Sequence, residues 1–127
     1  MKNNSRILIV DDEPDLTLAF KLGLEDNGFE VDTFNDPHIA LSAFKSKSSY
    51  DLALIDIKMP EMSGFELYNE MKKIDDQVKV CFITAFDLKQ ADIDVIPLSS
   101  SNKKSVNIIR KPIEIEQMVQ EINRQLS

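Results

Sequence analysis

The chain has 127 residues, a formal net charge of −7 and one cysteine. This length predicts one domain over residues 1–127, large enough to bury a hydrophobic core and without a separate output domain. The negative charge argues against general binding to nucleic acid or to a membrane surface, because both favour a basic face. The sequence lacks the run of about 18 apolar residues that a membrane-spanning helix needs. A lone cysteine cannot form an internal disulfide, so we expect a cytoplasmic protein.

The chain begins with a strand that leads into acidic residues. Residues 7–10 are all apolar, which indicates a strand over 6–10 that is buried on both faces. Three consecutive acids follow at 11–13. The next segment is predicted to be a helix that begins near Pro14 and stops at Gly28, which can adopt the left-handed conformation of a helix cap.

A second strand and a second helix follow. Residues 30–34 alternate enough to indicate a short strand. Asp36 suits the N-cap of a helix and Pro37 suits its first position. We expect this helix to bury a stripe of four residues: Ile39, Ala40, Ala43 and Phe44.

The central strand ends in a carboxylate. Residues 52–55 form an unbroken apolar run, which is typical of the middle of a parallel sheet covered by helices. Asp56 closes this run, and Pro60 marks a turn soon afterwards. Because the carboxyl ends of parallel strands carry the chemistry of open α/β sheets, Asp56 is the first candidate for a functional residue.

The second half of the chain continues the alternation. The predicted elements are a helix over 65–74 with Leu67, Met71 and Ile74 inside, strands over 78–84 and 106–109, and a final helix after 115. Residues 87–105 should hold a fourth helix, but their apolar pattern is weak, Pro97 interrupts it and serines follow. We therefore predict an α/β doubly wound parallel sheet with helices on both faces and a fourth helix that is short, irregular or absent.

Polar side chains follow four of the predicted strands. Asp11 and Asp12 follow the first, Asp56 the third, Thr84 the fourth and Lys111 the fifth. Three carboxylates at one sheet edge repel one another unless a cation lies among them, and hard oxygen ligands suit Mg²⁺. With a lysine and a hydroxyl nearby, such a carboxylate could attack a phosphoryl group and become an acyl phosphate.

The motifs resemble those of the receiver domains of bacterial and archaeal response regulators, the CheY-like family. Each motif is weak alone, but the set is specific and spans nearly the whole chain in the family's order. The matching pieces are ILIVDDEP at 7–14, DLALIDIKMP at 51–60, Gly64, ITA at 83–85 and KP at 111–112.

The resemblance implies a function and a set of site residues. A receiver domain accepts a phosphoryl group from a sensor histidine kinase or a histidine phosphotransfer protein and then changes its binding to an output protein, here unknown. It is a signalling switch that catalyses only its own phosphorylation and dephosphorylation. By resemblance, Asp56 is the phosphoacceptor, and Mg²⁺ or Mn²⁺ binds Asp11, Asp12, Asp56 and the backbone carbonyl of Lys58. Thr84 and Lys111 contact the phosphoryl group.

The same resemblance implies the flavodoxin-like strand order 2-1-3-4-5 and a cis peptide bond between Lys111 and Pro112. Three departures concern signalling. Ile108 replaces the usual Tyr or Phe, so an aromatic ring cannot rotate toward Thr84. The spacing from Thr84 to Lys111 is longer than usual, and the common Gly-Ala pair before the fifth strand is missing.

Other interpretations remain open from the sequence. Asp11 and Asp12 could be an acidic turn before a helix, and Lys111 could be a surface lysine. The alternative function is a degenerate receiver-fold interaction module that acts without phosphorylation. An aspartate-nucleophile phosphohydrolase is a third interpretation, but such enzymes carry an acid where this chain has Lys58.

Overall fold

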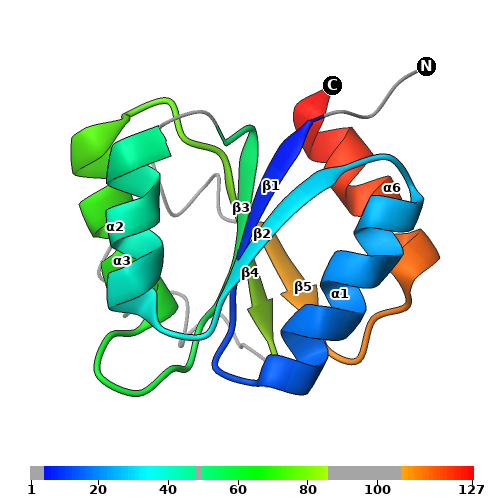
Figure 1. Ribbon diagram of the computed structural model, residues 1–127, viewed down its shortest axis with the longest axis horizontal. Helices are drawn as coiled ribbons and strands as arrows, with labels where there is room; N and C mark the ends of the chain where they lie inside the picture. Colours follow the sequence, from blue (N-terminus) through cyan, green and yellow to red (C-terminus); the bar gives the residue numbers. More distant parts are fainter. Residues whose placement is uncertain (1–4, 48–49, 86–106) are drawn as a thin grey trace.

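A computed structural model describes residues 5–47, 50–85 and 107–127 of the chain (Figure 1). These residues form a five-stranded sheet in the order β2-β1-β3-β4-β5, and every neighbouring pair is parallel. The strands are β1 (Arg6–Val10), β2 (Glu30–Phe34), β3 (Leu52–Asp56), β4 (Val80–Thr84) and β5 (Asn107–Arg110). The predicted fold class and strand order are confirmed.

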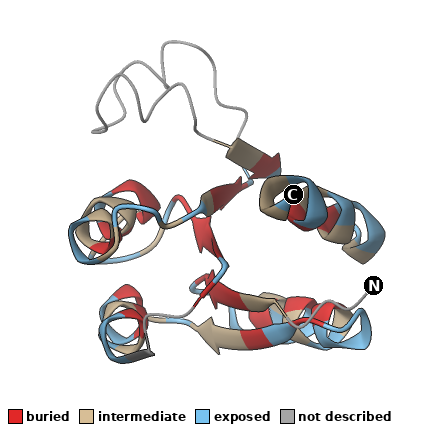
Figure 2. Ribbon diagram, turned by 90° about the horizontal axis from the view of Figure 1, so that it is seen from above, coloured by how far each residue is buried: buried red, intermediate tan, exposed pale blue. Residues whose placement is uncertain are grey.

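Helices cover both faces of the sheet. They are α1 (Pro14–Asp26), α2 (Pro37–Lys47), α3 (Gly64–Ile74) and α6 (Ile115–Leu126). Helices α1 and α6 lie on one face, and α2 and α3 lie on the other (Figures 1 and 2). The predicted fourth helix, over 87–105, lies outside the described residues. Within the described ranges, every helix is too short or too polar to cross a bilayer.

The sheet separates two hydrophobic cores, and its central strands contribute to both. In β1, Leu8 and Val10 pack with α2 and α3, whereas Ile7 and Ile9 pack with α1 and α6. β3 alternates in the same way, and all five of its residues are buried. Figure 2 shows this buried band along the middle of the molecule. Strands covered on both faces need apolar residues at every position, which explains the unbroken runs in the sequence.

Local signals place the ends of two helices. Gly28 has φ 91°, so the predicted left-handed conformation after α1 is confirmed. The Asp36 carboxylate accepts a hydrogen bond of 2.8 Å from the His38 amide, which confirms it as the residue that caps α2. Gly28 thus lies where the chain turns from α1 into β2, and Asp36 lies where it turns from β2 into α2.

Two predicted inward positions are wrong. Ile39 is 58% exposed, because the buried face of α2 is centred on Ala40 and Phe44 and turns toward Leu41 instead. Successive helical residues are about 100° apart, so a shift of the face by one position moves Ile39 into solvent. Ile74, at the end of α3, is 37% exposed.

Strand β4 begins two residues later than predicted, and β5 extends to Arg110.

Candidate acidic site at the carboxyl edge of the sheet

Three carboxylates meet at the carboxyl ends of β1 and β3. These strands are neighbours in register, with Val10 beside Ile55, so the residues that follow them lie close together. Asp11, Asp12 and Asp56 each offer a carboxylate oxygen within 4.8 Å of the others. Asp11 and Asp56 are buried, while Asp12 is exposed. The structure therefore brings together the acids that the sequence placed on two separate strands.

Lys111 lies against this acidic cluster. Its Nζ atom is 2.8 Å from Oδ2 of Asp11 and 3.9 Å from Oδ2 of Asp56. The Lys111 amide donates a hydrogen bond of 2.7 Å to the carbonyl of Thr84, which ties the end of β5 to the end of β4. The Lys111–Pro112 peptide bond is cis, as expected. The interpretation of Lys111 as an unrelated surface lysine is therefore wrong.

The cluster changes the protonation of its members. Burial is the main cause that raises the pKa of the Asp56 carboxyl to about 7, and the charge of Asp11 adds to the effect. Burial likewise raises the pKa of Asp11 above its ordinary value, although Lys111 opposes this. Burial alone would lower the pKa of Lys111, but its close ion pair with Asp11 and the other nearby negative charges raise it. The single positive charge of Lys111 therefore does not offset the effect of burial and repulsion on these acids.

One oxygen of Asp11 is left for a further ligand. Oδ1 accepts a hydrogen bond of 3.0 Å from the Glu13 amide. Oδ2 is fully buried and has no hydrogen-bond partner among the described residues, although the Lys111 ammonium lies close to it as an ion pair. A buried, incompletely satisfied carboxylate oxygen beside two other carboxylates fits a hard divalent cation such as Mg²⁺.

Thr84 and Lys58 flank Asp56. Thr84 is the buried last residue of β4, one position beyond Ile83, which pairs with Asp56. The Lys58 amide donates a hydrogen bond to the Asp56 carboxylate, which lowers the pKa of that group against the effect of burial. Both residues lie at the sheet edge where the sequence placed them, while the role of the Lys58 carbonyl stays a prediction.

Comparison with known proteins identifies the family. A model of the response regulator receiver domain matches residues 7–123. The chain belongs to this receiver-domain family. It is similar to the chemotaxis protein CheY of Bacillus subtilis, at 34% identity over 124 residues that cover 96% of this chain and 98% of that protein. The response regulator receiver protein CpdR of Brucella abortus is 31% identical over 121 residues, which cover 95% of this chain and 96% of CpdR.

A solved receiver structure agrees with this assignment. The response regulator protein TrrA from Thermotoga maritima, in complex with Mg²⁺-BeF, has a TM-score of 0.79 and 31% identity. The match covers 96% of this chain and 99% of that one. The predicted resemblance is confirmed, and the chain is a receiver domain of two-component signal transduction.

The receiver site has two supporting residues that the sequence reading did not identify as such. Asn35, just after β2, donates hydrogen bonds of 2.8 Å to the carbonyl of Asp11 and 3.0 Å to the hydroxyl of Thr17. Gly64 approaches β3 so closely that a Cβ atom on it would lie 2.3 Å from the carbonyl oxygen of Asp56. No pattern in the sequence predicts the role of Asn35, whereas Gly64 is one of the residues that carry the family resemblance.

The loop from Asp56 to α3 is held at both ends. The Gly64 amide donates a hydrogen bond of 2.8 Å to the carbonyl of Ile57. Ser63 and Glu66 form a capping box, in which each side chain accepts a hydrogen bond from the other residue's amide. Within the loop, Glu61 has φ 72°, a left-handed conformation that is uncommon for a residue with a side chain. This backbone positions Lys58 beside Asp56 of the acidic cluster.

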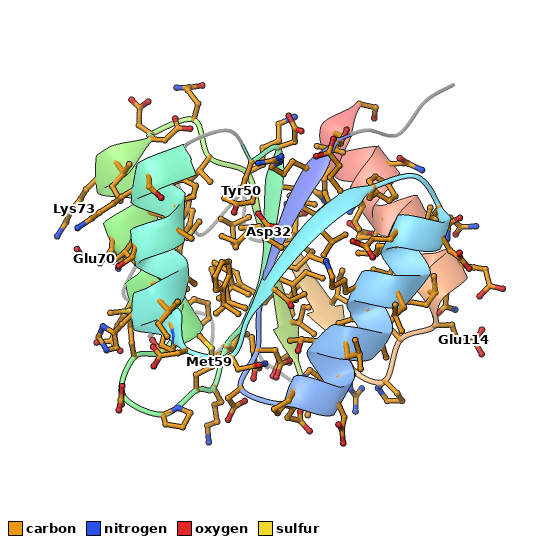
Figure 3. The ribbon with its side chains drawn as sticks, in the orientation of Figure 1. Asp32, Tyr50, Met59, Glu70, Lys73 and Glu114 are labelled. Atoms are coloured by element: carbon orange, nitrogen blue, oxygen red, sulfur yellow. The ribbon has the colours of Figure 1, made fainter. Side chains whose placement is uncertain are left out.

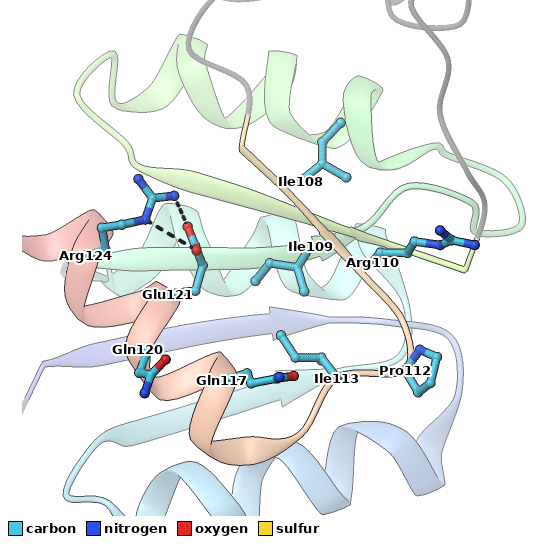
Figure 4. A pocket seen from close by; sticks show the side chains of 9 residues that line it. All are labelled: Ile108, Ile109, Arg110, Pro112, Ile113, Gln117, Gln120, Glu121 and Arg124. Atoms are coloured by element: carbon cyan, nitrogen blue, oxygen red, sulfur yellow. Dashed lines mark hydrogen bonds and ion pairs between the residues drawn. The ribbon is translucent and has the colours of Figure 1, made fainter.

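A groove lies along β5 and α6, away from the acidic cluster. It has a volume of about 440 Å³, and Figure 4 shows Ile108 and Ile109 on opposite sides of β5. Arg124 and Glu121 form an ion pair on its α6 side. Ile108 packs against the core on the side of α2 and α3. The residue that replaces the family's usual aromatic ring is therefore a partly buried packing residue here.

Proposed function

We propose that Asp56 accepts a phosphoryl group from the histidine of a sensor kinase or a histidine phosphotransfer protein. The observation that carries this proposal is the position of its carboxylate, buried at the end of β3 among two other acids and 3.9 Å from the Lys111 ammonium. No other carboxylate in the described ranges ends a fully buried strand. TrrA supports the proposal, because that relative is described in complex with Mg²⁺-BeF.

The transfer is a substitution at phosphorus. An Asp56 carboxylate oxygen forms a bond to the phosphorus atom while the bond from phosphorus to the donor's imidazole nitrogen breaks. The imidazole keeps the electron pair of the broken bond and takes up a proton. The product is an acyl phosphate on Asp56, which water later hydrolyses to regenerate the carboxylate.

The neighbouring residues divide the remaining tasks. Asp11, Asp12, Asp56 and the Lys58 carbonyl would hold Mg²⁺ or Mn²⁺, which when bound offsets negative charge on the transferring oxygens. Lys111 and the Thr84 hydroxyl would contact phosphoryl oxygens. The phosphoryl group thus ends on the chain's own carboxylate.

Phosphorylation would also act as the signal. An acyl phosphate adds about −1.5 to −2 charges at the end of β3. This charge draws Lys111 and Thr84 toward it and so biases the ends of β4 and β5. With Ile108 in place of an aromatic ring, the change must reach the output protein by another route than ring rotation.

The test is phosphorylation with acetyl phosphate and Mg²⁺, followed by intact-mass measurement. We expect one added phosphoryl group in the native protein and in Asp51→Asn, and none in Asp56→Asn. Asp51 is a suitable control because it directly precedes β3 at the opposite edge, where its carboxylate accepts a hydrogen bond from the Arg6 amide. An unmodified native protein, or a modified Asp56→Asn protein, would contradict the proposal and favour an interaction module that acts without phosphate.

A further inference from the structure

Glu13 uses its side chain in an unusual way for the residue that precedes a helix. It is the N-cap residue of α1, and its side chain makes no capping hydrogen bond. N-cap side chains commonly accept a hydrogen bond from the first helical turn. Here the Glu13 carboxylate turns away from the helix and accepts a hydrogen bond of 3.2 Å from Nζ of Lys111.

Lys111 is therefore shared among three acids at different distances. Its Nζ atom lies 2.8 Å from Asp11, 3.2 Å from Glu13 and 3.9 Å from Asp56. The Lys111 side chain is 13% exposed, whereas that of Glu13 is 64% exposed, so Glu13 occupies the solvent side of the ammonium. Of the three acids, Asp56 is the farthest from Lys111.

We propose that Glu13 is a positioning residue that competes with the phosphoryl group for Lys111. The inference rests on the proposed function, because only a phosphoryl group on Asp56 requires Lys111 to move toward it. The Glu13–Lys111 ion pair stabilises the unmodified state, and it must weaken when the ammonium contacts a phosphoryl oxygen. Glu13 thus lowers the affinity of the site for a phosphoryl group and sets how easily the switch is turned on.

Removing the Glu13 charge should therefore strengthen binding of a phosphoryl mimic. An ion pair with one exposed partner contributes modestly, so Glu13→Gln is expected to tighten binding about two- to fivefold. Glutamine keeps the length of the side chain, and Glu13 makes no side-chain cap that α1 would lose.

Two matched variants separate this contact from a general effect of charge. Asp15 lies in the first turn of α1, two residues from Glu13, and makes no ion pair among the described residues. Glu114 is the N-cap residue of α6, also without a side-chain cap, and Figure 3 shows it at the outer side of that helix. Asp15→Asn and Glu114→Gln each remove one negative charge without removing a contact to Lys111.

The experiment is a titration of each protein with beryllofluoride at saturating Mg²⁺ and about 0.15 M salt, where distant charges are screened. Fluorine NMR reports the bound fraction directly. We expect tighter binding in Glu13→Gln and an affinity close to that of the native protein in both controls. Unchanged or weaker binding in Glu13→Gln, or an equal gain in Asp15→Asn, would overturn the competition. If the native protein binds no beryllofluoride, the proposed function itself fails.

Discussion

The carboxylates at the two edges of the sheet have different surroundings. At the amino edge, Asp51 accepts a hydrogen bond of 2.8 Å from the Arg6 amide, and the Arg6 guanidinium pairs with Glu30 at 3.0 Å. Close by, Asp32 accepts a hydrogen bond of 2.6 Å from the Tyr50 hydroxyl (Figure 3). At the carboxyl edge, in contrast, Asp11, Asp12 and Asp56 converge, and Lys111 is the cation beside them.

The difference indicates which edge is structural and which is functional. A carboxylate with its own donor stabilises the fold and leaves little to gain from a ligand. Buried carboxylates that share one ammonium cost stability, and a ligand that neutralises them recovers that cost. The raised pKa of Asp56, to about 7, has the same causes: burial first, and then the neighbouring charge of Asp11. Four changes test the contrast.

Gly64→Ala should have the largest effect on stability. Its Cβ atom would meet the carbonyl oxygen of Asp56 at 2.3 Å, and two backbone segments would have to separate. We expect a loss of about 3 kcal/mol in the free energy of unfolding, measured by urea denaturation, together with weaker Mg²⁺ binding.

Gly23→Ala is the control for that variant. Its Cβ atom would lie 2.5 Å from Cδ1 and 2.6 Å from Cγ1 of Ile115, so that side chain must repack, but no backbone atom stands in the way. Alanine also favours the helix by about 1 kcal/mol, which offsets part of this cost, so we expect a smaller loss than in Gly64→Ala. An equal loss in the free energy of unfolding in both variants would show that the close approach of Gly64 to Asp56 does not matter more than an ordinary packing contact.

Asp56→Asn should change how stability depends on pH. The folded pKa of Asp56, about 7, exceeds its ordinary value of 3.8, so the folded state holds the proton more tightly than the unfolded state does. The free energy of unfolding of the metal-free native protein should therefore fall as pH rises from about 4 to about 7. The variant lacks this titration and should be about 2 kcal/mol more stable than the native protein at pH 8.

Denaturation in a chelator, repeated from pH 4 to pH 8, measures this difference. Mg²⁺ should restore the stability of the native protein at pH 8 and leave Asp56→Asn nearly unchanged. A difference between the two proteins that is the same at every pH would mean that repulsion at this edge does not involve Asp56.

Asn35→Ala tests whether a residue outside the acidic cluster helps to hold Asp11 in place. It removes the hydrogen bonds to the Asp11 carbonyl and to Thr17, which should cost about 1–2 kcal/mol. Calorimetric titration should also show weaker Mg²⁺ binding, because the backbone that places Asp11 loses a tether. Asn27→Ala removes an amide-to-carbonyl hydrogen bond to Gly23, at the C-terminal end of α1, and should leave Mg²⁺ binding unchanged.

Tyr50→Phe should have the smallest effect, and only on stability. The Tyr50 ring stacks on Phe44, and phenylalanine keeps that contact. Loss of the hydrogen bond to Asp32 should cost about 1 kcal/mol in thermal or urea denaturation. Mg²⁺ affinity should not change. A marked fall in Mg²⁺ affinity would show that the two edges of the sheet are coupled.

Much of the fold could be predicted from the sequence because it depends on short-range patterns. The apolar runs at 7–10 and 52–55 indicate strands buried on both faces, and Gly28, Asp36 and Pro37 punctuate the helices. Such signals lie within a few residues of the element that they specify. The gathering of Asp11 and Asp56 then follows from parallel connectivity, whereas the order of the strands was implied by the resemblance of the motifs to the receiver family.

The contacts that adjust the site were decided by the tertiary structure. Glu13 and Lys111 are 98 positions apart, and only the packing of β1 beside β3, and of β3 and β5 on β4, brings them to 3.2 Å. Asn35 reaches Asp11, and Gly64 reaches Asp56, across elements whose spacing no local pattern records. The exposed Ile39 has the same cause, because the inward direction of a helix is set by the surface against which it packs. Periodicity in the sequence specifies which residues can be buried. Which distant side chains come into contact, and which face of a helix is buried, depends on how the helices pack on the sheet.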